Sequence, residues 1–179
     1  MPVMEVLVLG GGAPLGPGGC ETASMHRFSS TTDSEAVVAA DRAAIWAALT
    51  DPNVLPKLTP LLERIEARDD VWRWELQRLP VLGVVVDPTF TERMDFVELR
   101  RIGFTHEPPQ GKDERAGAEG WYELSDAEGG THLSISLTLH VELPLSRFAG
   151  PAVQAVMKSA MALTGDRFAA NLEHHLGLR

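Results

Sequence analysis

The stretch 131–143 alternates apolar and polar side chains along its whole length. Leucine, isoleucine and valine occupy the odd positions from 133 to 143, and histidine, serine, threonine and glutamate occupy the even ones. A period of two predicts a β-strand with one buried face and one face toward solvent. The buried face of so long a strand needs an apolar layer against it, so the chain must fold into at least two packed layers.

Residues 147–176 follow this strand and predict a long amphipathic helix, because their apolar side chains recur three and four positions apart. The expected apolar stripe consists of Val153, Val156, Met157, Ala160, Leu163, Phe168, Leu172 and Leu176. Gly165 lies inside this segment and predicts a bend, since glycine lowers helix propensity by about 1 kcal/mol. The helix and the inner face of the sheet are therefore the expected two layers.

The earlier segments supply the rest of the sheet and two short helices. Asp41 is suited to cap a first helix over 42–49, and Pro52 is tolerated at the start of a second helix that Pro60 ends. The expected antiparallel strands are 29–40, 61–67, 71–79, 89–99, 101–107, 120–125 and 131–143. The polar segment 108–117 predicts a loop. This order, with strands in series and helices segregated from them, defines an α+β domain.

One apolar connection, 80–88, fits no strand of this series. It contains three consecutive valines, Val84–Val86, and a glycine, Gly83. The valines either add a short strand or simply cover the core.

Length, charge and cysteine usage limit the classes of function. The chain has 179 residues, a formal net charge of −9 and a single cysteine, Cys20. This length favours one domain. An acidic chain without a basic block is unsuited to nucleic acid and to an anionic membrane surface. No stretch reaches the roughly 18 consecutive apolar residues of a membrane span, and a lone cysteine is typical of a cytoplasmic protein.

The first 25 residues differ in composition from the rest. Residues 1–9 are apolar but lack the basic start and cleavage pattern of a signal peptide. A dinucleotide-binding turn would need a helix directly behind the glycine-rich run 10–19, and its prolines prevent one from starting. We expect 1–25 to be a flexible Gly/Pro-rich arm, with Met25 as an alternative start, and 26–179 to form the domain.

Several motifs occur in the order typical of one superfamily. They are 41–52 (DRAAIWAALTDP), a helix with a Thr-Asp-Pro turn; 71–76 (VWRWEL), a third strand; 129–133 (GGTHL), the start of the last strand; and Asn171, Leu172, Leu176 and Gly177, a helix ending. Over about 29–177 the chain resembles the START-like superfamily, also called SRPBCC or Bet v1-like, which includes polyketide cyclase/dehydrase-like proteins. The resemblance implies a helix-grip fold, in which a curved antiparallel sheet wraps around a long C-terminal helix.

The resemblance also implies a cavity between helix and sheet that holds an apolar or amphipathic small molecule. The side chains expected to line it are Trp72, Trp74, Leu76, Phe90, Glu92, Met94, Phe96, Phe104, His106, Tyr122, Ile135, Leu137, Leu139, Met157, Met161 and Phe168. Ordinary core packing is the alternative explanation for each apolar position, because methionines fill irregular gaps in cores as well as adaptable pockets.

Two ionisable residues fall in phase with the apolar sets. Glu92 lies between two apolar strand residues, and His106 lies two positions beyond Phe104. A buried carboxylate costs several kcal/mol unless it is paired or protonated. Glu92 is therefore a polar contact inside the pocket, a partner of Arg78 or Arg93, or a residue exposed at a bulge. His106 lines the pocket or reaches solvent at the strand end, and the two together would permit acid–base chemistry.

The other candidate motifs do not predict a metal or cofactor site. His174 and His175 are adjacent on the helix and point to different faces, and His132 and His140 are eight residues apart on the polar face of their strand. A Gly-x-Ser-x-Gly motif and a phosphate-binding loop are absent from the sequence. The charged run 63–70 is expected to be a solvated strand edge and turn that discourages edge pairing.

Three functions are consistent with these features. The leading hypothesis is non-enzymatic binding or transport of a lipid, quinone or polyketide-like molecule. The alternative is a polyketide aromatase or cyclase in the same cavity, with Glu92, His106 and Tyr122 as candidate groups. The third is a partner-binding module without a ligand, which an exposed apolar patch would favour. The protein is expected to be a monomer or a homodimer.

The first prediction concerns the arm. A chain that lacks residues 1–24 is expected to fold with an unchanged thermal midpoint, because the core motifs all lie beyond them. Circular dichroism melting of the two forms measures this, and loss of folding in the shortened chain contradicts it.

Overall fold

The computed structural model describes residues 24–178, and most of the expected arm lies outside this range. Its elements are β1 (His26–Val38), α1 (Arg42–Leu49), α2 (Leu55–Leu58), β2 (Leu62–Arg68), β3 (Val71–Leu76), β4 (Leu79–Val81), β5 (Val84–Val86), β6 (Thr89–Val97), β7 (Arg101–His106), β8 (Ala116–Ala127), β9 (Gly130–Leu143), a 3₁₀ turn η1 (Arg147–Ala149) and α3 (Gly150–His175). The order of strands and helices agrees with the α+β prediction.

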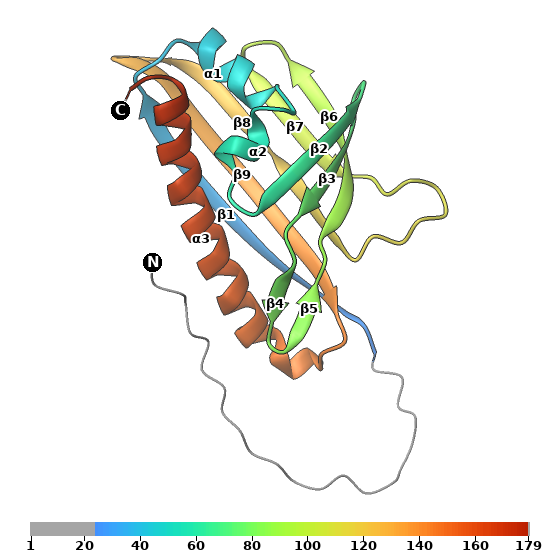
Figure 1. Ribbon diagram of the computed structural model, residues 1–179. Coiled ribbons are helices and arrows are strands. Elements are labelled where there is room, and N and C mark those ends of the chain that lie inside the picture. Colours follow the sequence, from blue (N-terminus) through green and yellow to red (C-terminus); the bar gives the residue numbers. More distant parts are fainter. Residues whose placement is uncertain (1–23, 179) are drawn as a thin grey trace, which may run out of the picture.

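A curved antiparallel sheet of seven strands forms one layer, in the order β1-β9-β8-β7-β6-β3-β2. Helix α3 runs alongside it as the second layer, and α1 and α2 lie at one end (Figure 1). Strands β4 and β5 form a separate hairpin near the start of α3. The helix packs mainly against β1 and α2. This is the helix-grip arrangement.

Strand β9 has the alternation that the sequence predicts. Leu133, Val141 and Leu143 are buried on the face toward the core. The β9 strand pairs with β1 on one side and with β8 on the other, and Gly130 and Leu143 mark its ends. Both long ladders therefore place odd-numbered β9 residues on the core face, since paired residues share a face.

Strand boundaries differ from the expected ones at several places. Strand β8 begins at Ala116 rather than at 120, because β9 continues to Leu143 and supplies ladder partners for 116–119. The expected loop is shorter for the same reason. Strand β1 begins at His26, strand β3 ends at Leu76, and the apolar connection forms the β4–β5 hairpin. Local propensity is weak in these segments, so pairing across the sheet sets their limits.

The long helix is continuous through Gly165. Its side chains Val153, Met161, Phe168 and Leu172 are buried, and Met157 is half-buried. The expected stripe also contained Val156, Ala160 and Leu163, but these are exposed. The closest backbone neighbours of the helix are the edge strand β1 and α2, and its side chains Phe168 and Leu172 join the core cluster that contains Trp72 and Phe90.

Helices α1 and α2 cover the end of the core. Asp41 caps α1 as expected, since its carboxylate accepts a hydrogen bond of 2.8 Å from the backbone N–H of Ala44. The side-chain amide of Asn171 in α3 donates to the Leu58 carbonyl of α2 at 2.9 Å. The Thr131 hydroxyl donates to the Ala40 carbonyl at 2.8 Å, which fixes the start of β9 to the segment before α1.

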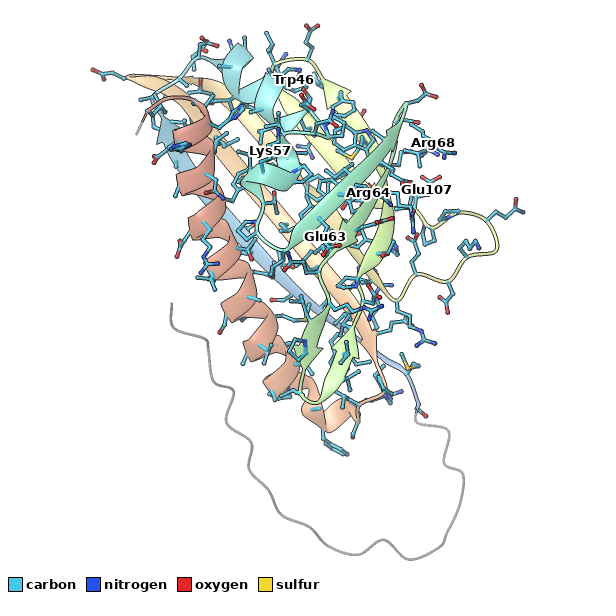
Figure 2. The ribbon with its side chains drawn as sticks, in the orientation of Figure 1. Trp46, Lys57, Glu63, Arg64, Arg68 and Glu107 are labelled. Atoms are coloured by element: carbon cyan, nitrogen blue, oxygen red, sulfur yellow. The ribbon has the colours of Figure 1, made fainter. Side chains whose placement is uncertain are left out.

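The charged run predicted to be a strand edge lies on β2, an edge strand of the sheet. Arg64 bridges Glu66 and Glu75, and Arg73 on β3 approaches the same two carboxylates. Figure 2 shows Glu63, Arg64 and Arg68 along this strand. Charged side chains on an edge strand discourage pairing with another chain.

The second prediction follows from the two kinds of glycine in this fold. Gly165→Ala is expected to raise the free energy of unfolding by about 0.5–1 kcal/mol, because alanine favours the helix and a Cβ there meets no atom within 4 Å. Gly117→Ala is the matched control and is expected to lower stability, because its Cβ would overlap the rings of His140 and His106. Urea unfolding of both variants measures the difference; a destabilised Gly165→Ala protein would contradict a continuous helix.

Candidate ligand-binding site

The register of the sheet brings most of the predicted lining residues onto one face. Trp74 lies opposite Phe90, and Trp72 lies opposite Glu92. Glu92 is in turn the cross-strand partner of His106. The same face continues through two further pairs, Met94 with Phe104 and Tyr122 with Ile135.

Burial divides these residues into two groups. The deeply buried ones are Trp72, Phe90, Glu92, Met94, Phe104, Met161 and Phe168. The half-buried ones are Trp74, Leu76, His106, Tyr122, Ile135, Leu137, Leu139 and Met157. The half-buried apolar residues lie on β3, β8, β9 and α3, and their side chains pack against the two buried core clusters.

Phe96 lies apart from both groups. Its side chain is 39% exposed, and its ring contacts Trp46 of α1 at a centroid distance of 6.2 Å and Trp72 at 5.9 Å. It therefore belongs to the contact between α1 and the sheet.

Aromatic side chains form a continuous surface beside Glu92. Trp72 and Trp74 have centroids 6.2 Å apart, and Trp74 stacks on Phe90 at 6.4 Å with an interplanar angle of 13°. Phe104 and Tyr122 approach to 5.7 Å. The indole Nε1 of Trp74 is buried and has no hydrogen-bond partner. This surface is apolar but includes one unsatisfied donor.

Glu92 is the most unusual residue on this face. It is 2% exposed, and its Oε2 has no hydrogen-bond partner. The two arginines that the sequence offered as partners are bound elsewhere, since Arg78 pairs with Asp87 and Arg93 pairs with Asp70 and Glu107. Burial raises the pKa of Glu92 well above its ordinary value, which favours the protonated carboxyl.

The same buried surroundings also change the pKa of Tyr122. Burial raises the pKa of its hydroxyl, and the negative charge that Glu92 carries when ionised raises it further. Both groups are therefore held in their uncharged, proton-donating forms. A site of this kind suits contact with a neutral polar group.

His106 is hydrogen-bonded to the carboxylate of Glu114 rather than to that of Glu92. Its Nε2 lies 3.1 Å from Glu114 Oε2. Glu114 also accepts hydrogen bonds from the backbone N–H of Thr91 at 2.7 Å and from its hydroxyl at 2.8 Å. The ring of His140 lies 4.7 Å from that of His106. His106 and Glu92 are cross-strand partners, but the imidazole is hydrogen-bonded to a different acid.

Sequence reasoning missed two members of this histidine cluster. Glu114 lies in the expected loop and carried no signal. His140 is on the strand face that the alternation assigns to solvent, yet it is buried. Its pKa falls to about 4 because of burial and the nearby positive charges of Arg27 and His106. The small residue Gly117 leaves room for both rings.

Three other histidines lie outside this cluster. His132 approaches Glu35 at 3.3 Å, and His174 and His175 are exposed at the end of α3. Within residues 24–178, no group of three or more histidine, cysteine, aspartate or glutamate side chains is arranged to hold a metal ion. In the same range, no helix is both long and apolar enough to cross a bilayer.

The family of the chain follows from a sequence comparison. Residues 25–173 match the family described as polyketide cyclase / dehydrase and lipid transport. The chain belongs to this family. The matched range contains strands β1 to β9 and ends within α3. No curated protein gives a significant match to this family member.

Solved structures resemble the family member in fold. The protein TTHA0849 from Thermus thermophilus is 18% identical with a TM-score of 0.60, and the match covers 82% of this chain and 96% of that one. A START superfamily protein from Mycobacterium smegmatis is 19% identical with a TM-score of 0.55, covering 86% and 98%. Ara h 8.0201 is 18% identical with a TM-score of 0.52, covering 83% and 99%. The expected START-like and Bet v1-like fold is thereby confirmed.

The third prediction concerns the pH dependence of stability. Unfolded Glu92 ionises near 4.5, while the folded protein favours its protonated form, so wild-type stability falls as the pH rises from 4.5 toward the folded pKa. Glu92→Gln lacks this loss and is expected to gain stability relative to wild type as the pH rises, by at most about 1.4 kcal/mol per pH unit. Urea unfolding between pH 4 and pH 8 measures the difference at each pH.

A difference that stays constant over this range would show that Glu92 has an ordinary pKa. Comparison at equal pH removes the contribution of His140. Its lowered pKa costs both proteins the same stability as the pH falls from 6.5 toward 4.

Proposed function

We propose that this protein binds a hydrophobic or amphipathic small molecule between the inner face of the sheet and α3, and that it carries the molecule without transforming it. Lipids, quinones and polyketide-like aromatics are the candidate classes. The observation that carries the proposal is the buried, unpartnered carboxyl of Glu92 within an aromatic surface. A buried polar group without a partner costs about 1–3 kcal/mol, and a ligand would remove that cost.

The half-buried apolar side chains support the position of the ligand. Ile135, Leu137 and Leu139 belong to the core face but are only half-buried. Covering such surface contributes about 25 cal/mol per Å². We place the apolar molecule beside Phe168 and Leu172, the α3 residues that share a core cluster with Trp72 and Phe90.

The polar side chains support a ligand with an uncharged polar group. The protonated Glu92 donates and accepts hydrogen bonds, and the Trp74 indole donates. A carbonyl or hydroxyl oxygen satisfies such groups. The 16 candidate lining residues include no lysine or arginine, so an anionic head group would have no counter-ion among them, and it would face an acid.

The alternative function, an aromatase or cyclase, has one specific observation in its favour. Glu92 and Tyr122 are both proton donors, and a donor beside a ketone promotes aldol chemistry. The base that such chemistry also needs is less evident, because His106 is hydrogen-bonded to Glu114. We therefore favour the carrier, and conversion of a bound poly-ketone by the purified protein would reverse this preference.

The fourth prediction tests the carrier and its polar contact. The protein binds a long-chain alcohol or methyl ketone, as measured by quenching of tryptophan fluorescence, at least tenfold more tightly than the acid of equal chain length. Glu92→Leu weakens binding of the alcohol by about tenfold, the equivalent of one hydrogen bond of about 1.4 kcal/mol. Glu92→Gln retains most of the affinity, because its amide also donates and accepts.

Val37→Ser is the matched control, since this exposed residue lies at the far end of β1. Equal binding of the acid and the alcohol contradicts a contact between Glu92 and an uncharged polar group, but it is still consistent with the carrier function. The carrier function is contradicted if none of the long-chain alcohols, ketones and acids binds and if protein purified from its own host releases no small molecule.

A further inference from the structure

One end of the molecule is formed by two segments that are far apart in the sequence. They are 79–86, which contains the β4–β5 hairpin, and 143–158, which contains η1 and the first turns of α3 (Figure 1). We call these two segments the hairpin end. Their side chains join Phe28 of β1 and Val141 of β9 in a small separate core, which further comprises Leu143 and Val153 with Val81, Val84, Val86, Leu145, Ala149 and Met157 around them.

The hairpin end differs in charge from the rest of the chain. Neither segment contains an aspartate or a glutamate, although the chain has 25 acidic residues and a net charge of −9. The only charged residues of the two segments are Arg147 and Lys158, and both are exposed. The two segments themselves therefore carry two positive charges, although Asp87 and Glu142 lie one residue outside them.

Large apolar side chains project from this end into solvent. Phe148 of η1 is 97% exposed, Val85 of the hairpin is 68% exposed and Leu82 at its turn is 48% exposed. Each lies beside residues that pack inward. Exposed apolar side chains gathered on one surface mark an interaction site more often than those scattered singly.

A shallow hollow of about 450 Å³ lies between the start of β1 and the η1–α3 junction. Its lining residues are Met25, His26, Arg27, Phe28, Arg147 and Gly150. Within residues 24–178, neither Arg27 nor Arg147 forms an ion pair, although Arg27 lies opposite Glu142 in the β1–β9 ladder. Two unpaired guanidinium groups at one hollow favour phosphate, which arginine binds in a bidentate manner.

We propose that the hairpin end docks on a phospholipid bilayer containing anionic lipids, with Phe148, Val85 and Leu82 inserted among the head groups and Arg27 and Arg147 against lipid phosphates. Apolar side chains flanked by arginine and lysine are the composition that binds the bilayer interface. The acidic body of the protein then points away from the membrane, so its repulsion falls off with distance.

A second copy of the chain is the less favourable occupant. A two-fold dimer would place this end against itself. Arg147 and Lys158 of one copy would then face the same two cations of the other copy, and neither segment contains an acidic residue to pair with them. The proposal does not depend on ligand binding between the sheet and α3.

The fifth prediction is tested by co-sedimentation of the full chain with vesicles. The vesicles are phosphatidylcholine alone or phosphatidylcholine with about 30 mol% phosphatidylglycerol, in low salt. Wild type binds the anionic vesicles, and added salt weakens the binding. Arg147→Glu and the double variant Phe148→Ser, Val85→Ser each lower the partition coefficient about tenfold or more.

Two exposed residues away from the hairpin end give matched controls. Arg68→Glu reverses a charge at the opposite end of the molecule, as Figure 2 shows. Val37→Ser removes an exposed apolar side chain at the far end of β1. Both retain wild-type partitioning within about twofold, and circular dichroism confirms that every variant folds.

Three results would overturn the proposal. One is wild type that does not bind the anionic vesicles. Another is an equal loss of vesicle binding in the control variants, which would mean that binding does not depend on the charged and apolar residues of the hairpin end in particular. The third is a wild-type dimer in light scattering that Phe148→Ser dissociates, because a second copy would then occupy the surface.

Discussion

The pairing of β9 with both of its neighbours is the constraint on which the rest of this structure depends. Thirteen residue pairs join it to β1 and twelve join it to β8. A slip of one residue would turn Leu133, Leu143 and their companions toward solvent, so the register is strongly fixed. The hydrogen bond from Thr131 to Ala40 then sets where α1 begins. The inner face of the sheet, and with it every candidate site residue, takes its position from these ladders.

The inner face carries a polar group that folding alone does not satisfy. Glu92 lies between Trp72 and His106 in the sheet, but the nearby arginines and His106 are bound to other acids. Its protonation reduces the cost of burial without supplying a partner for Oε2. Retaining such a residue where leucine would pack is reasonable if a ligand completes its hydrogen bonding. The same reasoning separates Glu92 from His106, which already has its partner.

Predictions from local sequence pattern were correct where a single periodicity extends over the segment. They were wrong where packing against other elements sets which side chains are buried. The alternation of β9 and the cap at Asp41 follow from short stretches of sequence, and both are confirmed. The α3 stripe was wrong at Val156 and Leu163, because apolar spacing cannot say which side of a helix an edge strand will cover. Glu92 was found by its phase in β6. Glu114 was missed because loop folding brings it to His106, and His140 was missed because alternation along β9 assigns it to the solvent face.

The sequence by itself determined the class of fold, since periods of two and of three to four allow only a sheet with a helix against it. It also determined which side chains share the inner face, because alternation along a strand is a local property. Tertiary structure alone decided how closely α3 covers that face and which acids capture the arginines. It also brought 79–86 and 143–158 together into an end without acidic residues. Net charge is a sum over the chain, whereas binding depends on the charges that folding places side by side.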